Sequence, residues 1–160
     1  MNAHISVRPA VPADVPLILR MIRALADYER LGDQVVGTED RLGELLFGAH
    51  PAAEVVLAYD DEEPVGFAVF FQTFSTFLVR PGMYLEDLFV VPDRRGRGIG
   101  RRLFSHVARM AVERQCGRME WSVLDWNAPA IGFYKKMGAQ PMDEWTVFRL
   151  TGGALENAGR

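Results

Sequence analysis

Apolar residues recur at helical spacing in four stretches of the chain. In the first stretch Val15, Ile18, Ile22 and Leu25 fall three or four positions apart, which places them on one face of a helix. Thr38 and Asn127 precede two of the other stretches and are typical of residues that cap a helix N-terminus. The pattern therefore predicts helices over residues 13–30, 39–47, 99–115 and 128–137.

Shorter apolar or alternating runs between these stretches predict strands. Two of the runs flank "DDEE", residues 60–63, as the arms of a hairpin would. The predicted strands span residues 4–10, 54–60, 64–74, 82–91, 118–124 and 143–150. A series of strands followed by a strand–helix–strand–helix–strand succession predicts an α/β fold with a mixed central sheet flanked by helices. No repeat or long linker interrupts it, so we expect one domain over residues 1–152 and a frayed tail at 153–160.

Composition narrows the class of protein. Hydrophobic residues make up 49% of the 160 residues, enough for a sizeable core. The 18 Lys and Arg residues against 21 Asp and Glu residues argue against nucleic-acid binding, which needs a broad basic face. No apolar run approaches the ~20 residues of a membrane span, and the first residues lack a secretory signal. Since Cys116 is the only cysteine, we expect a cytoplasmic protein without a disulfide.

The most unusual stretch is "RRGRGIG", residues 94–100, between a predicted strand and a predicted helix. A helix N-terminus attracts anions, and glycines let the backbone approach phosphate oxygens closely. The flanking arginines add charge-assisted hydrogen bonds, so a phosphate-bearing ligand is the direct inference. The stretch lacks the lysine of a P-loop and the spacing of the dinucleotide fingerprint G-x-G-x-x-G. A tight turn with solvated arginines is the plainer alternative.

Residues 95–100 fit R-x-x-G-x-G, which resembles the acetyl-CoA pyrophosphate loop of the GCN5-related N-acetyltransferase (GNAT) superfamily. "DWNAPAIGFYKKMGA", residues 125–139, looks like its second cofactor segment, and "YLEDLFVVP", residues 84–92, like the strand that accepts the pantetheine arm. Nearly the whole chain is similar to the diamine acetyltransferases, the spermidine/spermine and thialysine N-acetyltransferases. "LDWN", residues 124–127, is similar to the thialysine branch.

The resemblance implies a GNAT-like sheet with a splayed strand pair, acetyl-CoA as cosubstrate, no metal, and a homodimer. His4, His50 and His106 likewise have no metal-ligand spacing. The cofactor-binding residues that the resemblance implies are Leu88, Phe89, Val90, Arg95, Gly96, Arg97, Gly98, Ile99, Gly100, Arg101, Asn127 and Ala130.

Acetylation of an amine needs a proton acceptor at the ammonium group and a proton donor at the departing thiolate. The resemblance implies that Glu86 is the acceptor, directly or through water, and that Tyr134 is the donor. The implied substrate-binding residues are Tyr28, Glu29, Glu86, Asp87, Glu120 and Trp121. A salt bridge for Glu86, a solvated charge for Asp87 and sheet packing for Tyr134 are the alternatives.

Alternation along the strand at 82–91 predicts which side chains share a face with Glu86. It places on that face Tyr84, Leu88 and Val90, and on the other face Asp87 and Phe89.

The sequence therefore predicts an acetyl-CoA-dependent N-acetyltransferase acting on a primary amine of a small cationic substrate, either a polyamine or diamine or a thialysine-like amino acid. Transfer is expected to be direct, in a ternary complex. Two alternatives stay open: a protein lysine or N-terminal acetyltransferase, and a non-catalytic acyl-CoA-binding or sensing module.

Overall fold

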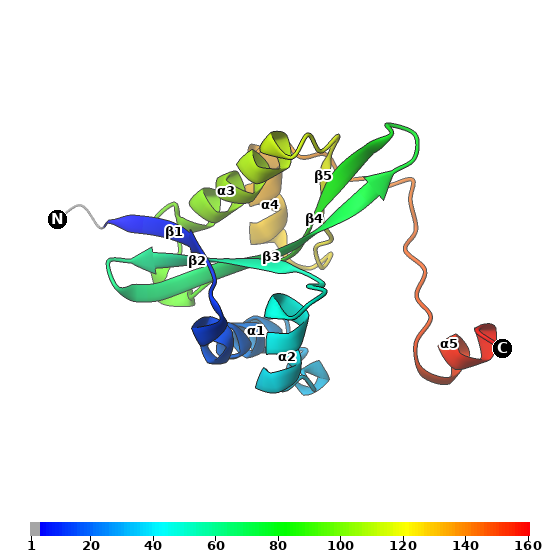
Figure 1. Ribbon diagram of the computed structural model, residues 1–160. Helices are drawn as coiled ribbons and strands as arrows, with labels where there is room; N and C mark the ends of the chain where they lie inside the picture. Colours follow the sequence, from blue (N-terminus) through cyan, green and yellow to red (C-terminus); the bar gives the residue numbers. More distant parts are fainter. Residues whose placement is uncertain (1–3) are drawn as a thin grey trace. The chain divides into compact units, whose positions relative to one another are not determined.

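A five-stranded mixed sheet organises the first part of the chain in the computed structural model, which describes residues 4–160 (Figure 1). Its strands follow the order of the sequence: β1 (Ile5–Pro9), β2 (Glu54–Asp60), β3 (Glu63–Ser75), β4 (Arg80–Val90) and β5 (Met119–Glu120). Strands β1 to β4 pair with one another in antiparallel fashion, and β5 pairs with β4 in parallel. The predicted mixed sheet and the hairpin around residues 60–63 are confirmed.

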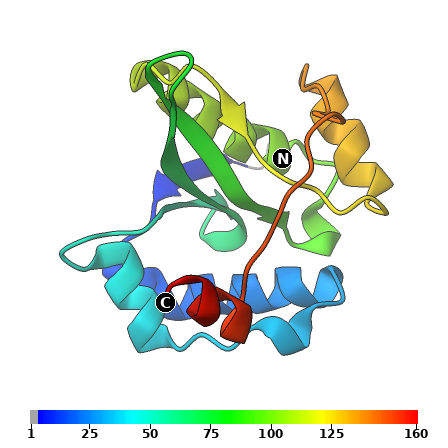
Figure 2. The same cartoon turned by 90° about the vertical axis from the view of Figure 1, so that its right-hand side faces the viewer.

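Helices cover both faces of this sheet (Figures 1 and 2). Helices α1 (Val15–Tyr28) and α2 (Glu39–Phe47) lie on one face, and α3 (Ile99–Glu113) lies on the other. Short 3-10 turns span Pro12–Asp14, Gly32–Gln34 and Pro92–Arg94. Helix α2 begins as predicted, because the Thr38 side chain accepts a hydrogen bond from the Arg41 N–H at 3.3 Å.

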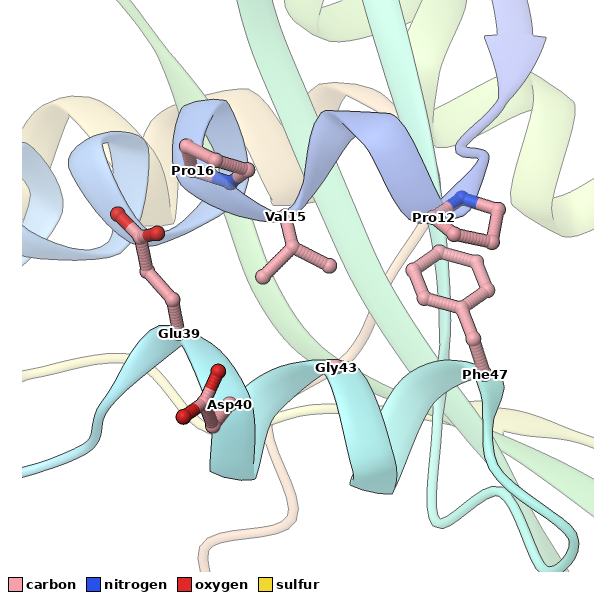
Figure 3. Close-up of a pocket in the computed structure, with 7 residues that line it drawn as sticks. All are labelled: Pro12, Val15, Pro16, Glu39, Asp40, Gly43 and Phe47. Carbon is pink, nitrogen blue, oxygen red and sulfur yellow. The ribbon is translucent and has the colours of Figure 1, made fainter.

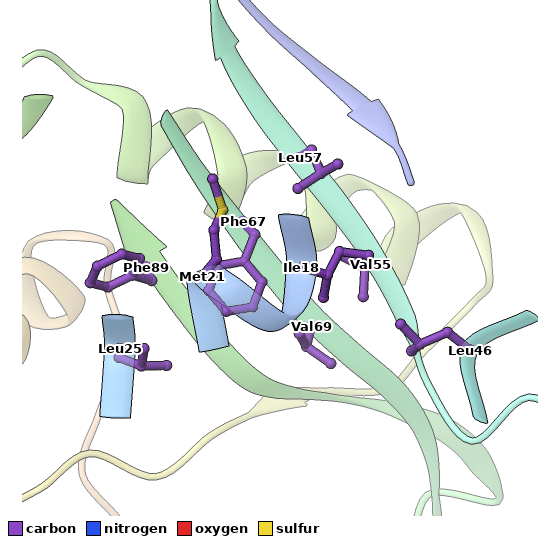
Figure 4. Packing of buried hydrophobic residues seen from close by; sticks show 9 residues of the cluster. All are labelled: Ile18, Met21, Leu25, Leu46, Val55, Leu57, Phe67, Val69 and Phe89. Carbon is purple, nitrogen blue, oxygen red and sulfur yellow. The ribbon is translucent and has the colours of Figure 1, made fainter. Parts of the chain in front are cut away.

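The core between the sheet and α1 comes from the apolar faces that the sequence pattern predicts (Figure 4). Ile18 of α1 is fully buried, as are Leu57 of β2 and Phe67 of β3. Phe67 meets Phe89 of β4 edge to face, with ring centroids 6.3 Å apart. This packing fixes the end of β4 against the first helix.

A β-bulge interrupts the pairing of β3 with β4. Phe70 pairs with Leu85 and Val69 pairs with Asp87, so Glu86 is the extra residue. Paired residues share a face of the sheet, and Phe71, Val69 and Phe67 alternate regularly along β3 on the α1 side. Their partners Tyr84, Asp87 and Phe89 therefore also share the α1 side.

The bulge corrects the predicted alternation of β4. Tyr84 was expected to share a face with Leu88 and Val90, but it lies on the opposite face from them. The physical reason is the extra residue, which shifts the two-residue period by one position.

The chain divides into two compact units, Met1–Ser122 and Val123–Arg160. The second unit contains α4 (Ala128–Lys136) and α5 (Gly152–Ala158). Asn127 caps α4 as predicted, since its side chain accepts a hydrogen bond from the Ala130 N–H at 3.3 Å.

Two predicted strands near the C-terminus are wrong. The strand expected at 118–124 is reduced to Met119–Glu120, and residues 143–150 form no strand. Helix α5 lies within the tail expected to fray, and the fraying stays a prediction. A strand requires a pairing partner, and the described elements of the second unit are helices only. Apolar residues of the segment, including Trp145 and Phe148, are accordingly exposed. Across residues 4–160, no helix combines the length and apolar character needed to cross a membrane.

Candidate active site

The glycine stretch forms a turn that opens onto the N-terminus of α3. Gly96 and Gly98 have φ angles of 76° and 80°, in the left-handed region that favours glycine, and Gly98 is the N-cap of α3. A Cβ atom placed on either residue would meet no heavy atom within 4 Å, so the backbone of the turn is open. The first-turn N–H groups of an α-helix have no acceptor within the helix, and the helix dipole makes this end positive. The turn is therefore suited to an anion.

The arginines around this turn are held by the protein itself. Arg95 donates from Nε to the Val90 carbonyl at 2.9 Å, and its guanidinium lies 4.3 Å from the centre of the Tyr28 ring. Arg97 donates to Asp60 at 2.8 Å, and Arg102 donates to the Ile5 carbonyl at 3.0 Å. Arg101 is exposed on the first turn of α3. The sequence predicted the positive charge at this turn but not the partners that orient it.

Acidic residues gather where β4 passes the end of α1. The bulge places Asp87 on the α1 face, where burial together with the charges of Glu86 and Glu29 raises its pKa to about 6. Burial also raises the pKa of Glu29, which follows the last residue of α1. Glu86 itself is exposed. Such a group of carboxylates attracts a cation.

Arg95 joins the acidic group to the glycine turn. Its guanidinium contacts Tyr28, the neighbour of Glu29, and lies 5.5 Å from the centre of the Phe89 ring, two residues beyond Asp87. The structure therefore brings together Tyr28, Glu29, Asp87 and the turn within the first unit.

β4 also carries backbone that is free of the fifth strand. The ladder between β4 and β5 covers only Met83 and Tyr84, although β4 continues to Val90. The two strands therefore part ahead of Leu88, Phe89 and Val90, which agrees with the predicted splayed pair.

Other predicted site residues have local contacts of their own. Glu120 forms an ion pair with Arg118 at 2.8 Å, and Trp121 packs edge to face on Phe104 of α3 at 5.3 Å. In the second unit Asn127 is buried and Ala130 is its hydrogen-bond partner, while Tyr134 lies half-buried on α4 next to Phe133. The substrate and cofactor contacts of these residues stay predictions.

A separate pocket of about 390 Å³ lies between the start of α1 and α2 (Figure 3). Its lining residues are Pro12, Val15, Pro16, Glu39, Asp40, Gly43 and Phe47, none of which is a predicted site residue. Among residues 4–160, no three His, Cys, Asp or Glu side chains are grouped as ligands for a metal ion.

Comparison with known proteins decides the family. The sequence profile described as the acetyltransferase (GNAT) family matches residues 20–139. The chain belongs to this family. As a member it is an acetyltransferase, and its mixed sheet with flanking helices is the GNAT fold.

Two curated relatives and one solved structure of another protein each match this chain over almost its full length. The thialysine N-epsilon-acetyltransferase of Bos taurus is 38% identical over 99% of both chains. The L-ornithine N5-acetyltransferase NATA1 of Arabidopsis thaliana is 33% identical and covers 94% of this chain and 86% of its own. An integron cassette protein from the mobile metagenome of V. cholerae is 28% identical, with a TM-score of 0.82 over 98% of both chains.

Asp60 is the residue near the turn that sequence reasoning missed. It ends β2, and its side chain is only 6% exposed while it accepts hydrogen bonds from two arginines of the turn region. The sequence contained one indication of this role. Asp60 is the acidic residue that ends an otherwise apolar predicted strand, at the start of the predicted hairpin.

Replacing Asp87 by Asn tests the raised pKa through stability. The folded protein binds the Asp87 proton more tightly than the unfolded chain, because the folded pKa is about 6 against an ordinary 3.8. The Asp87 carboxyl therefore contributes a loss of stability as pH rises from about 4 to about 6, and this contribution is absent from Asp87→Asn. At pH 8 we expect the variant to be more stable by about 1–3 kcal/mol in urea denaturation, with the difference vanishing below about pH 4.

The matched control for this experiment is Asp143→Asn, which makes the same change at an exposed position. Its pH profile shows how far the loss of one exposed carboxylate changes stability by itself. Equal pH profiles for Asp87→Asn and the wild type would contradict a carboxyl group desolvated in the folded state.

Proposed function

We propose that this GNAT protein transfers acetyl from acetyl-CoA to the primary amine of a small cationic substrate, a polyamine or diamine or a thialysine-like amino acid, by direct transfer in a ternary complex. The observation that carries the proposal is the contact of Arg95 with Tyr28 and Phe89. This contact supports the proposal because it brings the acidic residues at the end of α1 close to the glycine turn.

The acidic group supports a cationic substrate. At pH 7 a carboxyl group with a pKa of about 6 is mostly ionised, so Asp87 carries a negative charge that burial makes costly. An ammonium group bound there would relieve both the desolvation and the repulsion from Glu29 and Glu86. Thialysine and ornithine, the amines in the names of two relatives, both carry such a primary amine.

The turn at residues 96–100 fits the phosphates of coenzyme A. Its two glycines of positive φ present open backbone, and the N–H groups of the α3 first turn supply donors without a competing acceptor in the helix. Leu88, Phe89 and Val90 lie on β4 beyond the end of its ladder to β5, so their backbone would receive the pantetheine arm. The bound thioester would supply the acetyl group.

Proton transfers complete the reaction. Glu86, exposed at the bulge, would accept a proton from the ammonium group, directly or through water, so that the neutral nitrogen can attack the thioester. Asp87 would hold the cation in place before that step. Tyr134 would give its hydroxyl proton to the departing thiolate, and the second proton that the nitrogen loses as the amide forms would restore the tyrosine hydroxyl through solvent.

Release of free coenzyme A thiol from acetyl-CoA tests the proposed function. The purified chain would be given thialysine, ornithine, lysine, spermidine, putrescine and a lysine-containing peptide in separate assays. We expect turnover with one or more of the small amines and little with the peptide. Turnover with the peptide alone would instead identify a protein acetyltransferase, and silence with every amine would contradict the proposal.

Replacing Gly98 by Val tests the turn as the coenzyme A site. Valine is strained at a φ of 80° and would place a branched side chain over the open backbone. We expect calorimetry to show at least about a hundredfold loss of coenzyme A affinity, or about 3 kcal/mol, with an unchanged circular dichroism spectrum. Gly37→Val is the control, because its added side chain would also meet open space and its φ is not in the left-handed region. Normal coenzyme A binding by Gly98→Val would refute the site.

Replacing Tyr134 by Phe tests the proton donor. We expect turnover to fall about a hundred- to thousandfold, the usual contribution of a general acid, while the affinity for coenzyme A stays within about twofold. Steady-state kinetics and calorimetry on the same preparation separate the two effects. Unchanged turnover would remove Tyr134 from the mechanism.

The homodimer and the cytoplasmic location stay predictions. Sedimentation equilibrium of the purified chain would test the first.

A further inference from the structure

Asp60 links the β2–β3 hairpin to the glycine turn through one carboxylate oxygen. Its Oδ2 atom accepts from Nη1 of Arg94 at 2.9 Å and from Nη1 of Arg97 at 2.8 Å. These arginines stand before and within the turn, 34 and 37 positions further along the chain. The contact therefore crosses from one loop to another and is not a local feature of the turn.

The two arginines are held to different degrees. Arg94 is 26% exposed and also donates to Glu63, the first residue of β3, so it is fixed from two sides of the hairpin. Arg97 is 40% exposed, and its hydrogen bond to Asp60 comes from Nη1. A guanidinium has five N–H donors in a fixed fork, so the exposed part of Arg97 retains donors that an anion could accept from.

A shared carboxylate allows two guanidinium groups to lie close together. Without it their like charges would drive them apart, and each side chain would regain the rotamers that the contact removes. The Asp60 side chain is itself only 6% exposed, so its negative charge depends on the same two bonds to offset the loss of hydration. The three residues form one unit that sets the position of the turn.

We propose that Asp60 is a positioning residue for the coenzyme A phosphates: it holds Arg97 and the glycine turn in the conformation that receives them. The inference rests on the proposed function, in that coenzyme A is taken as the ligand of the turn. Asp60 does not touch the ligand and acts through Arg94 and Arg97.

Two effects of Asp60 on an anion at the turn have opposite signs. Its negative charge repels a phosphate, but at a solvent-exposed turn that repulsion is screened. Its hydrogen bonds order two arginine side chains in advance, which removes an entropic cost from binding. Positioning is the larger effect in this account, so loss of the Asp60 charge weakens binding although it removes a repulsion.

Calorimetry with coenzyme A separates these effects by the sign of the change. For Asp60→Asn we expect the dissociation constant to rise about tenfold, since two arginines must then be ordered on binding. The KM for acetyl-CoA should rise in parallel, while kcat at saturation and the KM for the amine stay within about twofold. The matched control is Asp61→Asn, the same change at the exposed neighbouring residue, which should leave coenzyme A affinity unchanged.

Arg97→Gln supplies the second arm and does not disturb the buried carboxylate's bond to Arg94. Because Asp60 acts partly through Arg97, the loss of coenzyme A affinity in the double variant should be smaller than the sum of the losses in the two single variants. Asp60→Glu keeps the charge and should recover part of the affinity lost in Asp60→Asn. Thermal unfolding of every variant shows whether the comparison is made on folded protein, and Arg97→Gln carries the test if Asp60→Asn does not fold.

Equal or tighter coenzyme A binding by Asp60→Asn would overturn the positioning role, and so would additive losses in the double variant. If Asp60→Asn does not fold and only Arg97→Gln can be measured, unchanged coenzyme A affinity in Arg97→Gln would overturn the positioning role. If the wild-type chain itself bound no coenzyme A, the proposed function and this inference would both fall. Normal wild-type binding with an unaffected Asp60→Asn would refute only the role of Asp60.

Discussion

The bulge at Glu86 is the constraint on which the arrangement of the site depends. One extra residue in β4 turns Asp87 towards α1, beside Glu29, and sends Leu88 and Val90 to the side of α3. Without the bulge, regular alternation from Tyr84 would place Asp87 on the α3 side, away from α1. The same strand therefore presents a half-buried carboxylate to a cation on its α1 face and, beyond the end of its ladder to β5, backbone that β5 does not pair at its edge.

The parts of the fold that follow from local pattern were predictable. The apolar period of residues 15–25, the Thr38 cap and the glycine-rich turn each specify their structure over a few residues, and the chain forms all three. The bulge was missed, although "LEDLF", residues 85–89, places two polar residues next to each other and so breaks the two-residue period of a regular strand. The segment at 143–150 shows the converse, since alternation without a partner strand yields no strand.

The arginines of the turn were predictable from the local sequence, but the residues that they contact were not. The sequence shows how many arginines surround the glycines, but their partners are distant in sequence: Asp60 for Arg97, Tyr28 for Arg95 and Ile5 for Arg102. These contacts tie the first helix, the first hairpin and the first strand to one turn. Much of the positive charge is thus used to orient the turn, and the open backbone of Gly96 and Gly98 is left to meet an anion.

The central claim is that a cationic amine and a phosphate-bearing cosubstrate bind on the two sides of the Arg95 contact. A crystal structure of the chain with coenzyme A and thialysine would test it most directly. The account predicts the pyrophosphate on the backbone of residues 96–100 and the amine nitrogen within hydrogen-bonding distance of Glu86 or Asp87. Phosphates bound away from the turn, or an amine bound away from both carboxylates, would contradict it.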